Sequence, residues 1–248
     1  MTYAEALHAV QEQYCPEDYA ATVAQTKRDL FRLNLVAPRA GLSLSDVGSG
    51  IGAFAPACAA LGMSATVVDD FRDPGNLKLG EAAFNAHRRF GVKVVAADAS
   101  GGLPIESGFD VMTCFASIEH HHNSPKRMLH SMLEHTRPGG LFVLSVPNAA
   151  DLMKRIEMLL GRAQWSPMEE WYEASEFRGH VREPLIADLH YIASDLGLRD
   201  YRIVGRTFIW RESGFAKLAM EAVAHLIQLR PSLNSELFLI ARTPTAKP

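Results

Sequence analysis

Short apolar runs alternate with longer amphipathic stretches over residues 41–147. Apolar runs bounded by turn residues are typical of buried strands, and apolar residues at helical spacing are typical of helices. The runs predict strands at 42–47, 65–69, 92–97, 109–115 and 141–146. The stretches between them predict helices at 53–61, 76–90 and 125–136. This alternation predicts a parallel sheet with helices on both faces.

Helical patterns also flank this core on both sides. They predict helices at 3–13, 17–36, 149–160, 184–196 and 215–229. Two short apolar runs near the end of the chain predict further strands at 201–204 and 237–241. Residues 161–183 have no regular pattern. We therefore expect an N-terminal helical cap at 1–40, a ligand-binding core at 41–147, an insert that acts as a lid at 148–183, and a C-terminal part of the same domain at 184–248.

Composition narrows the class of protein. The 248 residues carry a net charge of −3, so the chain lacks the basic balance of a nucleic-acid-binding protein. Its three cysteines, Cys15, Cys58 and Cys114, are far apart and predict neither a disulfide framework nor a zinc site. No apolar run is long enough to span a membrane, and the first residues do not resemble a signal peptide. We expect a cytoplasmic protein, monomeric or homodimeric.

The segment Asp46-Val47-Gly48-Ser49-Gly50-Ile51-Gly52 ends the first predicted strand and opens a predicted helix. Glycines allow a ligand to approach the backbone closely, and a helix N-terminus offers free N–H groups. The segment therefore predicts a nucleotide-like ligand, and its spacing also fits the loose dinucleotide pattern. Asp46 before the turn and Asp98 after the third strand favour a ligand with cationic and amine groups over NAD. The chain also ends in strand, helix and strand, without a second mononucleotide-binding half.

These residues resemble motif I of the class I S-adenosylmethionine-dependent methyltransferases. Asp69 matches the acid that binds the ribose hydroxyls in that family, and Ala97-Asp98-Ala99 matches the segment that holds the adenine. Segments 109–120 and 133–142 match the fourth strand with its following loop and the crossing into the fifth strand. The resemblance implies a Rossmann-like, doubly wound α/β fold. Its seven-stranded sheet is mostly parallel, with helices on both faces and an antiparallel last strand.

The same resemblance implies S-adenosyl-L-methionine as donor and S-adenosyl-L-homocysteine as product. The residues expected to bind the donor are Asp46, Gly48, Ser49, Gly50, Gly52, Asp69, Asp70, Asp98, Ala99 and Phe115. Asp70 is the alternative to Asp69 as the ribose ligand.

Histidines supply the candidate general bases. His120 and His121 follow the fourth strand, and His180 lies in a His-x-Arg segment similar to one in small-molecule methyltransferases. Imidazole accepts a proton near neutral pH, and an activated sulfonium needs little besides placement and proton removal. Alternatively, Glu119 and His120 only shape the loop. We expect no metal site, because adjacent histidine side chains diverge and no second cluster has ligand spacing.

The acceptor is expected to be a small molecule, methylated at a hydroxyl of a sugar, a quinol or phenol, or a natural-product intermediate. Arg182, Trp165, Trp171 and Tyr172 are the candidate acceptor-binding residues. The chain lacks the Asn-Pro-Pro-Tyr or Asp-Pro-Pro-Tyr segment of nucleic-acid amino-methylating enzymes. Three alternatives stay open: an NAD(P)-dependent oxidoreductase, an N-methyltransferase of a small amine, and a donor-binding module without turnover.

Overall fold

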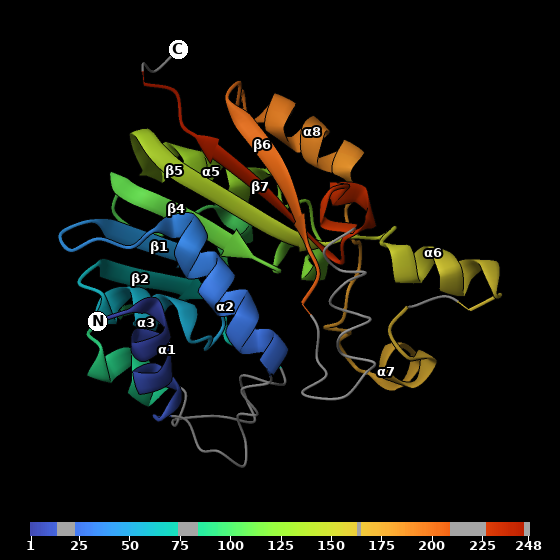
Figure 1. Ribbon diagram of the computed structural model, residues 1–248, viewed down its shortest axis with the longest axis horizontal. Helices are drawn as coiled ribbons and strands as arrows, with labels where there is room; N and C mark the ends of the chain where they lie inside the picture. The colour runs from blue at the N-terminus through green and yellow to red at the C-terminus, as the bar shows by residue number, and fades with distance from the viewer. Residues whose placement is uncertain (14–22, 74–83, 163–164, 209–226, 246–248) are drawn as a thin grey trace.

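A seven-stranded sheet forms the centre of the molecule (Figure 1). The computed structural model describes residues 1–13, 23–73, 84–162, 165–208 and 227–245. The strands are β1 (Ser43–Val47), β2 (Ser64–Asp69), β3 (Lys93–Ala96), β4 (Phe109–Phe115), β5 (Thr136–Pro147), β6 (Tyr201–Arg206) and β7 (Glu236–Arg242). Their order is β3-β2-β1-β4-β5-β7-β6, with β7 antiparallel to both neighbours. The predicted fold class is thereby confirmed.

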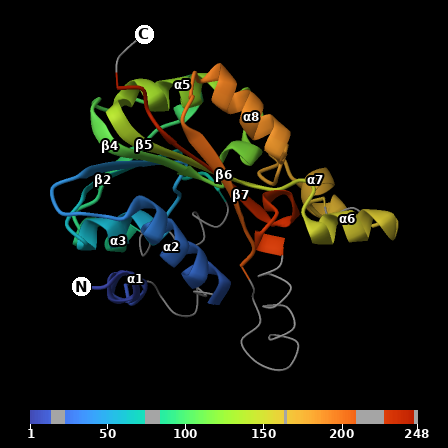
Figure 2. The ribbon, with the colours of Figure 1, turned by 45° about the horizontal axis from the view of Figure 1, so that its top comes forward.

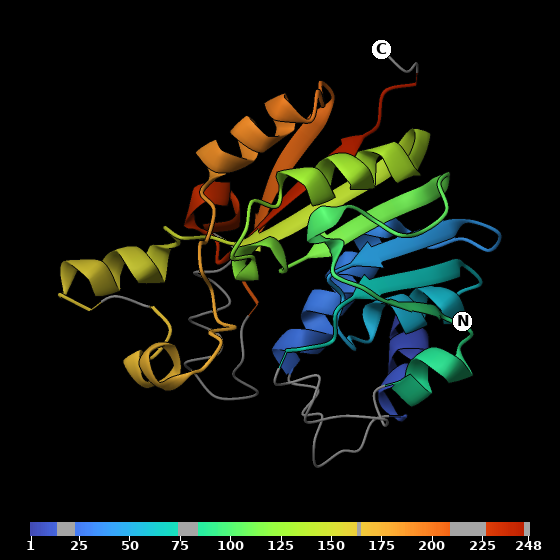
Figure 3. The same cartoon turned by 180° about the vertical axis from the view of Figure 1, so that it is seen from behind.

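Helices cover both faces of this sheet, as the turned and rear views show (Figures 2 and 3). On one face lie α1 (Tyr3–Gln11), α2 (Val23–Val36) and α3 (Phe54–Ala60), and on the other α5 (Lys126–His135) and α8 (Ile186–Asp195). Successive strand residues point to opposite faces, so each strand serves two cores. In β4, for example, Val111 and Phe115 join the core under α3, whereas Met112 and Cys114 join the core under α5.

The segment after β5 projects from the body of the molecule (Figure 1). It contains α6 (Leu152–Leu159) and α7 (Met168–Glu173), and neither helix has a buried residue. The expectation of an irregular segment at 161–183 was wrong for α7. Its first turn carries Glu169 and Glu170, and acidic residues there interact favourably with the helix dipole.

Strand β5 also differs from its prediction. It begins at Thr136 rather than Leu141, so it includes the Pro138-Gly139-Gly140 segment, whose residue types are typical of a turn. Thr136 pairs with Phe109 of β4, and the register shifts before Leu141 pairs with Val111. The glycines also bond to the last strand's extension, with Gly139 N–H donating to the Thr243 carbonyl. Pairing with β4 on one side and with Thr243 on the other thus keeps this segment in the strand, although proline and glycine favour a turn.

Some expected elements lie wholly or partly outside the described residues. Only the end of the helix expected at 76–90 is described, and most of the one at 215–229 is not. Cys15 also lies outside the described residues. Within the described part of the chain, no helix has the length and apolar character needed to cross a membrane.

Candidate functional site

A cavity of about 480 Å³ lies at the carboxyl ends of β1, β2, β3 and β4. This is the edge of a doubly wound sheet where ligands bind. The structure brings eight of the ten predicted donor-binding residues and two of the three candidate bases into its lining. They are Gly48, Ser49, Gly50, Asp69, Asp70, Asp98, Ala99, Phe115, His120 and His121.

The glycine turn after β1 has the conformation that the sequence predicts. Gly48 and Gly50 have φ angles of +65° and +53°, a region that side chains with a Cβ rarely adopt. Gly48 N–H donates to the Val68 carbonyl at 2.8 Å, which ties the turn to β2. A Cβ on Gly48 would lie 2.0 Å from Ser117 Oγ, so the turn after β4 is packed directly against this glycine. Sequence reasoning did not identify Ser117, which also lines the cavity.

Asp69 fixes the other side of the turn. Its carboxylate accepts hydrogen bonds from Gly50 N–H at 2.8 Å and from Phe71 N–H at 2.6 Å. Burial raises the pKa of Asp69, while these two backbone bonds oppose the shift. Each oxygen keeps a lone pair for a further donor, such as a ribose hydroxyl.

Asp46 and Gly52 do not line the cavity. Asp46 is 3% exposed and accepts a hydrogen bond from the Thr113 hydroxyl at 2.6 Å. Burial raises the pKa of Asp46 to about 7, against the opposing Thr113 bond and the nearby charge of Arg32. The sequence predicted a direct donor contact, which stays a prediction; the described structure shows this carboxylate buried and bonded to Thr113.

The cavity wall is rich in carboxylates. Asp98 caps the short helix η1 (Ala99–Gly101) by accepting from Ser100 N–H at 2.8 Å, which lowers the pKa of Asp98. Asp70 pairs with Arg178 at 3.3 Å, and Arg178 also pairs with Glu176 at 2.9 Å. Glu176 and Arg178 line the cavity from the segment after α7. Sequence reasoning missed both, because nothing local places this irregular segment over the strand ends.

Phe115 is held by a polar cluster that the sequence did not reveal. The Arg32 guanidinium lies 4.5 Å from the centre of the Phe115 ring, and Phe54 packs edge-on against it at 5.0 Å. Arg32 in turn contacts Asp29 at 3.2 Å and Glu236 at 3.5 Å. Buried ion pairs thus link Arg32 to Asp29, one turn earlier in α2, and to Glu236 of β7, and they anchor this helix beside Phe115.

A second cluster joins the turn after β4 to residues 178–183. The rings of His120 and His180 are 4.8 Å apart and nearly perpendicular. His120 Nδ1 lies 2.7 Å from the Arg178 carbonyl oxygen, and His180 Nδ1 lies 2.7 Å from Glu183 Oε1. The Glu183 bond raises the pKa of His180, whereas burial lowers the pKa of His121.

Glu119 lies beside these rings and is 1% exposed. Its backbone carbonyl accepts from Val181 N–H at 2.7 Å, but its carboxylate oxygens have no hydrogen-bond partner among the described residues. Burial raises the pKa of Glu119 to about 7.

The predicted acceptor residues are not brought together at the cavity. Trp165, Trp171 and Tyr172 are 76%, 57% and 72% exposed on the projecting segment, and none of them lines the cavity. Arg182 is also exposed and contacts Asp188 at 3.4 Å. Their role in acceptor binding stays a prediction.

The strand order, the glycine turn and the acid after β2 together define the class I methyltransferase fold. A family model described as "Methyltransferase domain" matches residues 19–202. The chain therefore belongs to this methyltransferase family. The predicted family and the donor class, S-adenosylmethionine, are confirmed at this level.

Individual relatives agree with the family. An uncharacterized methyltransferase of Mycolicibacterium vanbaalenii is 34% identical over 139 residues, which are 54% of this chain and 52% of that protein. One of a Mycobacterium species (strain KMS) is 36% identical over 130 residues, or 52% and 46% of the two chains. The chain thus matches only about half the length of these curated relatives.

Solved structures share the fold at low sequence identity. A putative methyltransferase of Bacillus halodurans has a TM-score of 0.58 at 17% identity, with 88% of this chain and 100% of that one covered. A possible histamine N-methyltransferase of Thermotoga maritima has a TM-score of 0.54 at 16% identity, with 87% and 89% covered. Phosphoethanolamine N-methyltransferase 2 of Haemonchus contortus, in complex with S-adenosyl-L-methionine, has a TM-score of 0.55 at 16% identity, with 88% and 52% covered.

Proposed function

We propose that the protein transfers the methyl group of S-adenosylmethionine to a hydroxyl of a small-molecule acceptor. The observation that carries this proposal is the acidic cavity built on the glycine turn. Asp69, Asp70 and Asp98 line it, together with Glu176. Carboxylates suit a ligand with a sulfonium, an ammonium and hydroxyl donors. The pyrophosphate of NAD(P) would be repelled by the same carboxylates, which favours a methyl donor over a dinucleotide.

In this proposal the donor's ribose lies at Asp69 and its adenine at Asp98 and Ala99. The bonds from Gly50 and Phe71 hold the Asp69 carboxylate in one orientation before the donor arrives. Gly48 and Ser49 let the methionine part approach the backbone. Phe115, fixed between Phe54 and Arg32, limits the cavity beneath it.

The transfer itself is an in-line displacement at carbon. An acceptor oxygen bonds to the methyl carbon, the carbon–sulfur bond breaks, and its electron pair stays on sulfur as S-adenosylhomocysteine. The acceptor's hydroxyl proton passes to a base. His120 and His121 line the cavity, and His120 Nδ1 must carry a proton because it faces a carbonyl oxygen. That tautomer leaves a lone pair on His120 Nε2 for proton removal.

A small amine is the second candidate acceptor. Two solved neighbours are described as a possible histamine N-methyltransferase and as a phosphoethanolamine N-methyltransferase. The carboxylates of Asp69 and Asp98 in the cavity lining would also attract a cationic amine. Paired acceptor panels of alcohols and amines with the same carbon skeletons would separate the two reactions, with S-adenosylhomocysteine formation as the readout.

Donor binding is tested by calorimetric titration with S-adenosylhomocysteine. We expect Asp69→Ala to weaken binding by about 1–3 kcal/mol, or roughly 5- to 150-fold, because ribose hydroxyls lose their partner. Asp195→Ala, an acid on α8 outside the cavity, is the matched control and should bind normally. Unchanged affinity of the Asp69 variant would contradict the assignment and favour Asp70. Tight NADH binding without S-adenosylhomocysteine binding would contradict the proposed function.

A further inference from the structure

Three potential metal ligands converge at the edge of the donor cavity. The ligand atoms of Glu119, His120 and His180 all lie within 4.8 Å of one another. Four-coordinate zinc with bonds of about 2.0–2.1 Å places its ligand atoms roughly 3.4 Å apart. Small side-chain rotations would therefore bring these three groups onto one cation.

The hydrogen bonds of both imidazoles leave one nitrogen free for a cation. His120 Nδ1 donates to the Arg178 carbonyl, and His180 Nδ1 donates to the Glu183 carboxylate. Neither partner can donate in return, so each neutral ring keeps its lone pair on Nε2. Metal-binding histidines almost always have their other ring N–H bonded to a carbonyl or carboxylate in this way.

The carboxylate of Glu119 supplies an independent indication. It is buried, and neither oxygen has a hydrogen-bond partner among the described residues. Burial of a carboxylate without a partner costs several kcal/mol in folded proteins. A cation between Glu119 and the two rings would supply the missing partner.

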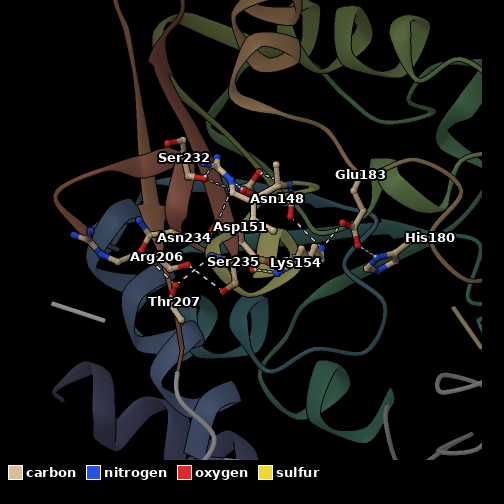
Figure 4. Close-up of polar contacts among 12 residues, drawn as sticks. Asn148, Asp151, Lys154, His180, Glu183, Arg206, Thr207, Ser232, Asn234 and Ser235 are labelled. Carbon is tan, nitrogen blue, oxygen red and sulfur yellow. Dashed lines mark hydrogen bonds and ion pairs between the residues drawn. The ribbon is translucent and has the colours of Figure 1, made fainter. Parts of the chain in front are cut away.

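A chain of polar contacts through Glu183 and Lys154 holds His180 in place. Glu183, which accepts from His180, also pairs with Lys154 of α6, and Lys154 Nζ donates to the Asn148 carbonyl at 3.0 Å (Figure 4). Asn148 is itself fixed by its side-chain bonds to the Ser232 and Asn234 carbonyls, at 3.0 and 2.8 Å. The contacts therefore connect His180 to the carboxyl end of β5.

We propose that Glu119, His120 and His180 bind one divalent transition-metal cation, with Zn²⁺ as the best match. Two imidazoles and one carboxylate form a ligand set typical of zinc sites that keep a fourth position open. Magnesium and calcium prefer sites made of oxygen ligands alone. The His180 side chain is 40% exposed, which gives the cation a path from solvent.

The site would affect methyl transfer through His120, which lines the donor cavity. A cation there polarises an acceptor hydroxyl in its open position and favours loss of the proton. While His120 holds the cation through Nε2, the proton passes instead to His121, the other candidate base in the cavity lining. This role rests on the proposed function, but the binding of the cation does not.

The test is a calorimetric titration of Zn²⁺ into the untagged full chain after treatment with a chelator. We expect one cation per chain with a dissociation constant of about 1 μM or tighter. Glu119→Gln and His180→Ala should each weaken binding by at least about 100-fold, and Glu183→Gln by roughly 10- to 100-fold. His190→Ala is the matched control, because that histidine lies on α8 and bonds to Tyr201 instead.

Two further measurements keep the result interpretable. Circular dichroism checks that each variant is folded, and Glu119→Gln preserves the shape of the side chain, unlike His180→Ala. Titration of the metal-free protein with S-adenosylhomocysteine tests donor binding separately. No stoichiometric Zn²⁺ binding, or binding that survives both Glu119→Gln and His180→Ala, would overturn the metal site. Intact donor binding in that case would leave the proposed function standing.

Discussion

We expect the buried carboxyl group of Asp46 to make the stability of the fold depend on pH near neutrality. Asp46 is almost completely inaccessible, and the Thr113 hydroxyl is its hydrogen-bond donor. Replacing it with asparagine keeps the shape and an oxygen for Thr113 but removes the ionisable group. The difference in unfolding free energy between wild type and Asp46→Asn should therefore change with pH.

The sign and size follow from the pKa of Asp46, which burial raises from 3.8 to about 7. Between these two values the folded state holds a proton that the unfolded state has released, so stability falls as pH rises. The full effect corresponds to about 4 kcal/mol, complete above the folded pKa and absent below the unfolded one. Between pH 5 and pH 8, wild type should lose about 2.5 kcal/mol relative to Asp46→Asn.

Urea unfolding followed by circular dichroism at several pH values between 5 and 8, without donor, measures this difference. Asp110→Asn on the neighbouring strand β4 is the matched control. Although burial opposes it, bonds from Ser43 and Arg137 hold the pKa of Asp110 below its ordinary value, so it does not titrate in this range. A difference for Asp46→Asn that stays constant within about 0.5 kcal/mol from pH 5 to pH 8 would refute the reasoning.

Two further substitutions test the packing around the site. Gly48→Ala should abolish measurable binding of S-adenosylhomocysteine, because its Cβ would overlap Ser117, whereas Gly41→Ala has open space and should cost only about 1–2 kcal/mol of backbone strain. Equal effects of the two on stability and binding would contradict this account. Asn148→Ala should destabilise the fold by about 1–3 kcal/mol in urea unfolding, because the buried amide donates to the Ser232 and Asn234 carbonyls. A loss below about 0.5 kcal/mol would show that water replaces these bonds.

The sequence predicted the core of the fold well because its signals there are local. The strand β1, the glycine turn and α3 are neighbours in the chain, and the positive φ angles of Gly48 and Gly50 follow from residue type. Asp69 and Asp98 could be predicted for the same reason, since Asp69 ends β2 and Asp98 closely follows β3 at the ligand-binding edge. The predictions failed where pairing outweighed local preference, as at the Pro138-Gly139-Gly140 segment in β5.

Residues from the last third of the chain could not be placed in this way. Arg178 and Glu176 reach the cavity only because the segment after α7 returns across the strand ends. Trp165 and Trp171 were expected at the acceptor pocket, yet lie exposed on the projecting segment. A tryptophan can lie in a ligand pocket or on an exposed segment. The residues next to it in the sequence do not show which of the two it occupies.

The sequence by itself determined the main strands, the glycine turn and the acids that indicate the donor, because each follows from a residue pattern within a short stretch of chain. The tertiary structure decided which groups the histidines lie beside. Within the sequence, His120 and His121 are adjacent and diverge, which argued against a metal site. The fold brings His180, far along the chain, beside His120 and the unpartnered carboxylate of Glu119. Long-range packing creates that arrangement, and no local pattern encodes it.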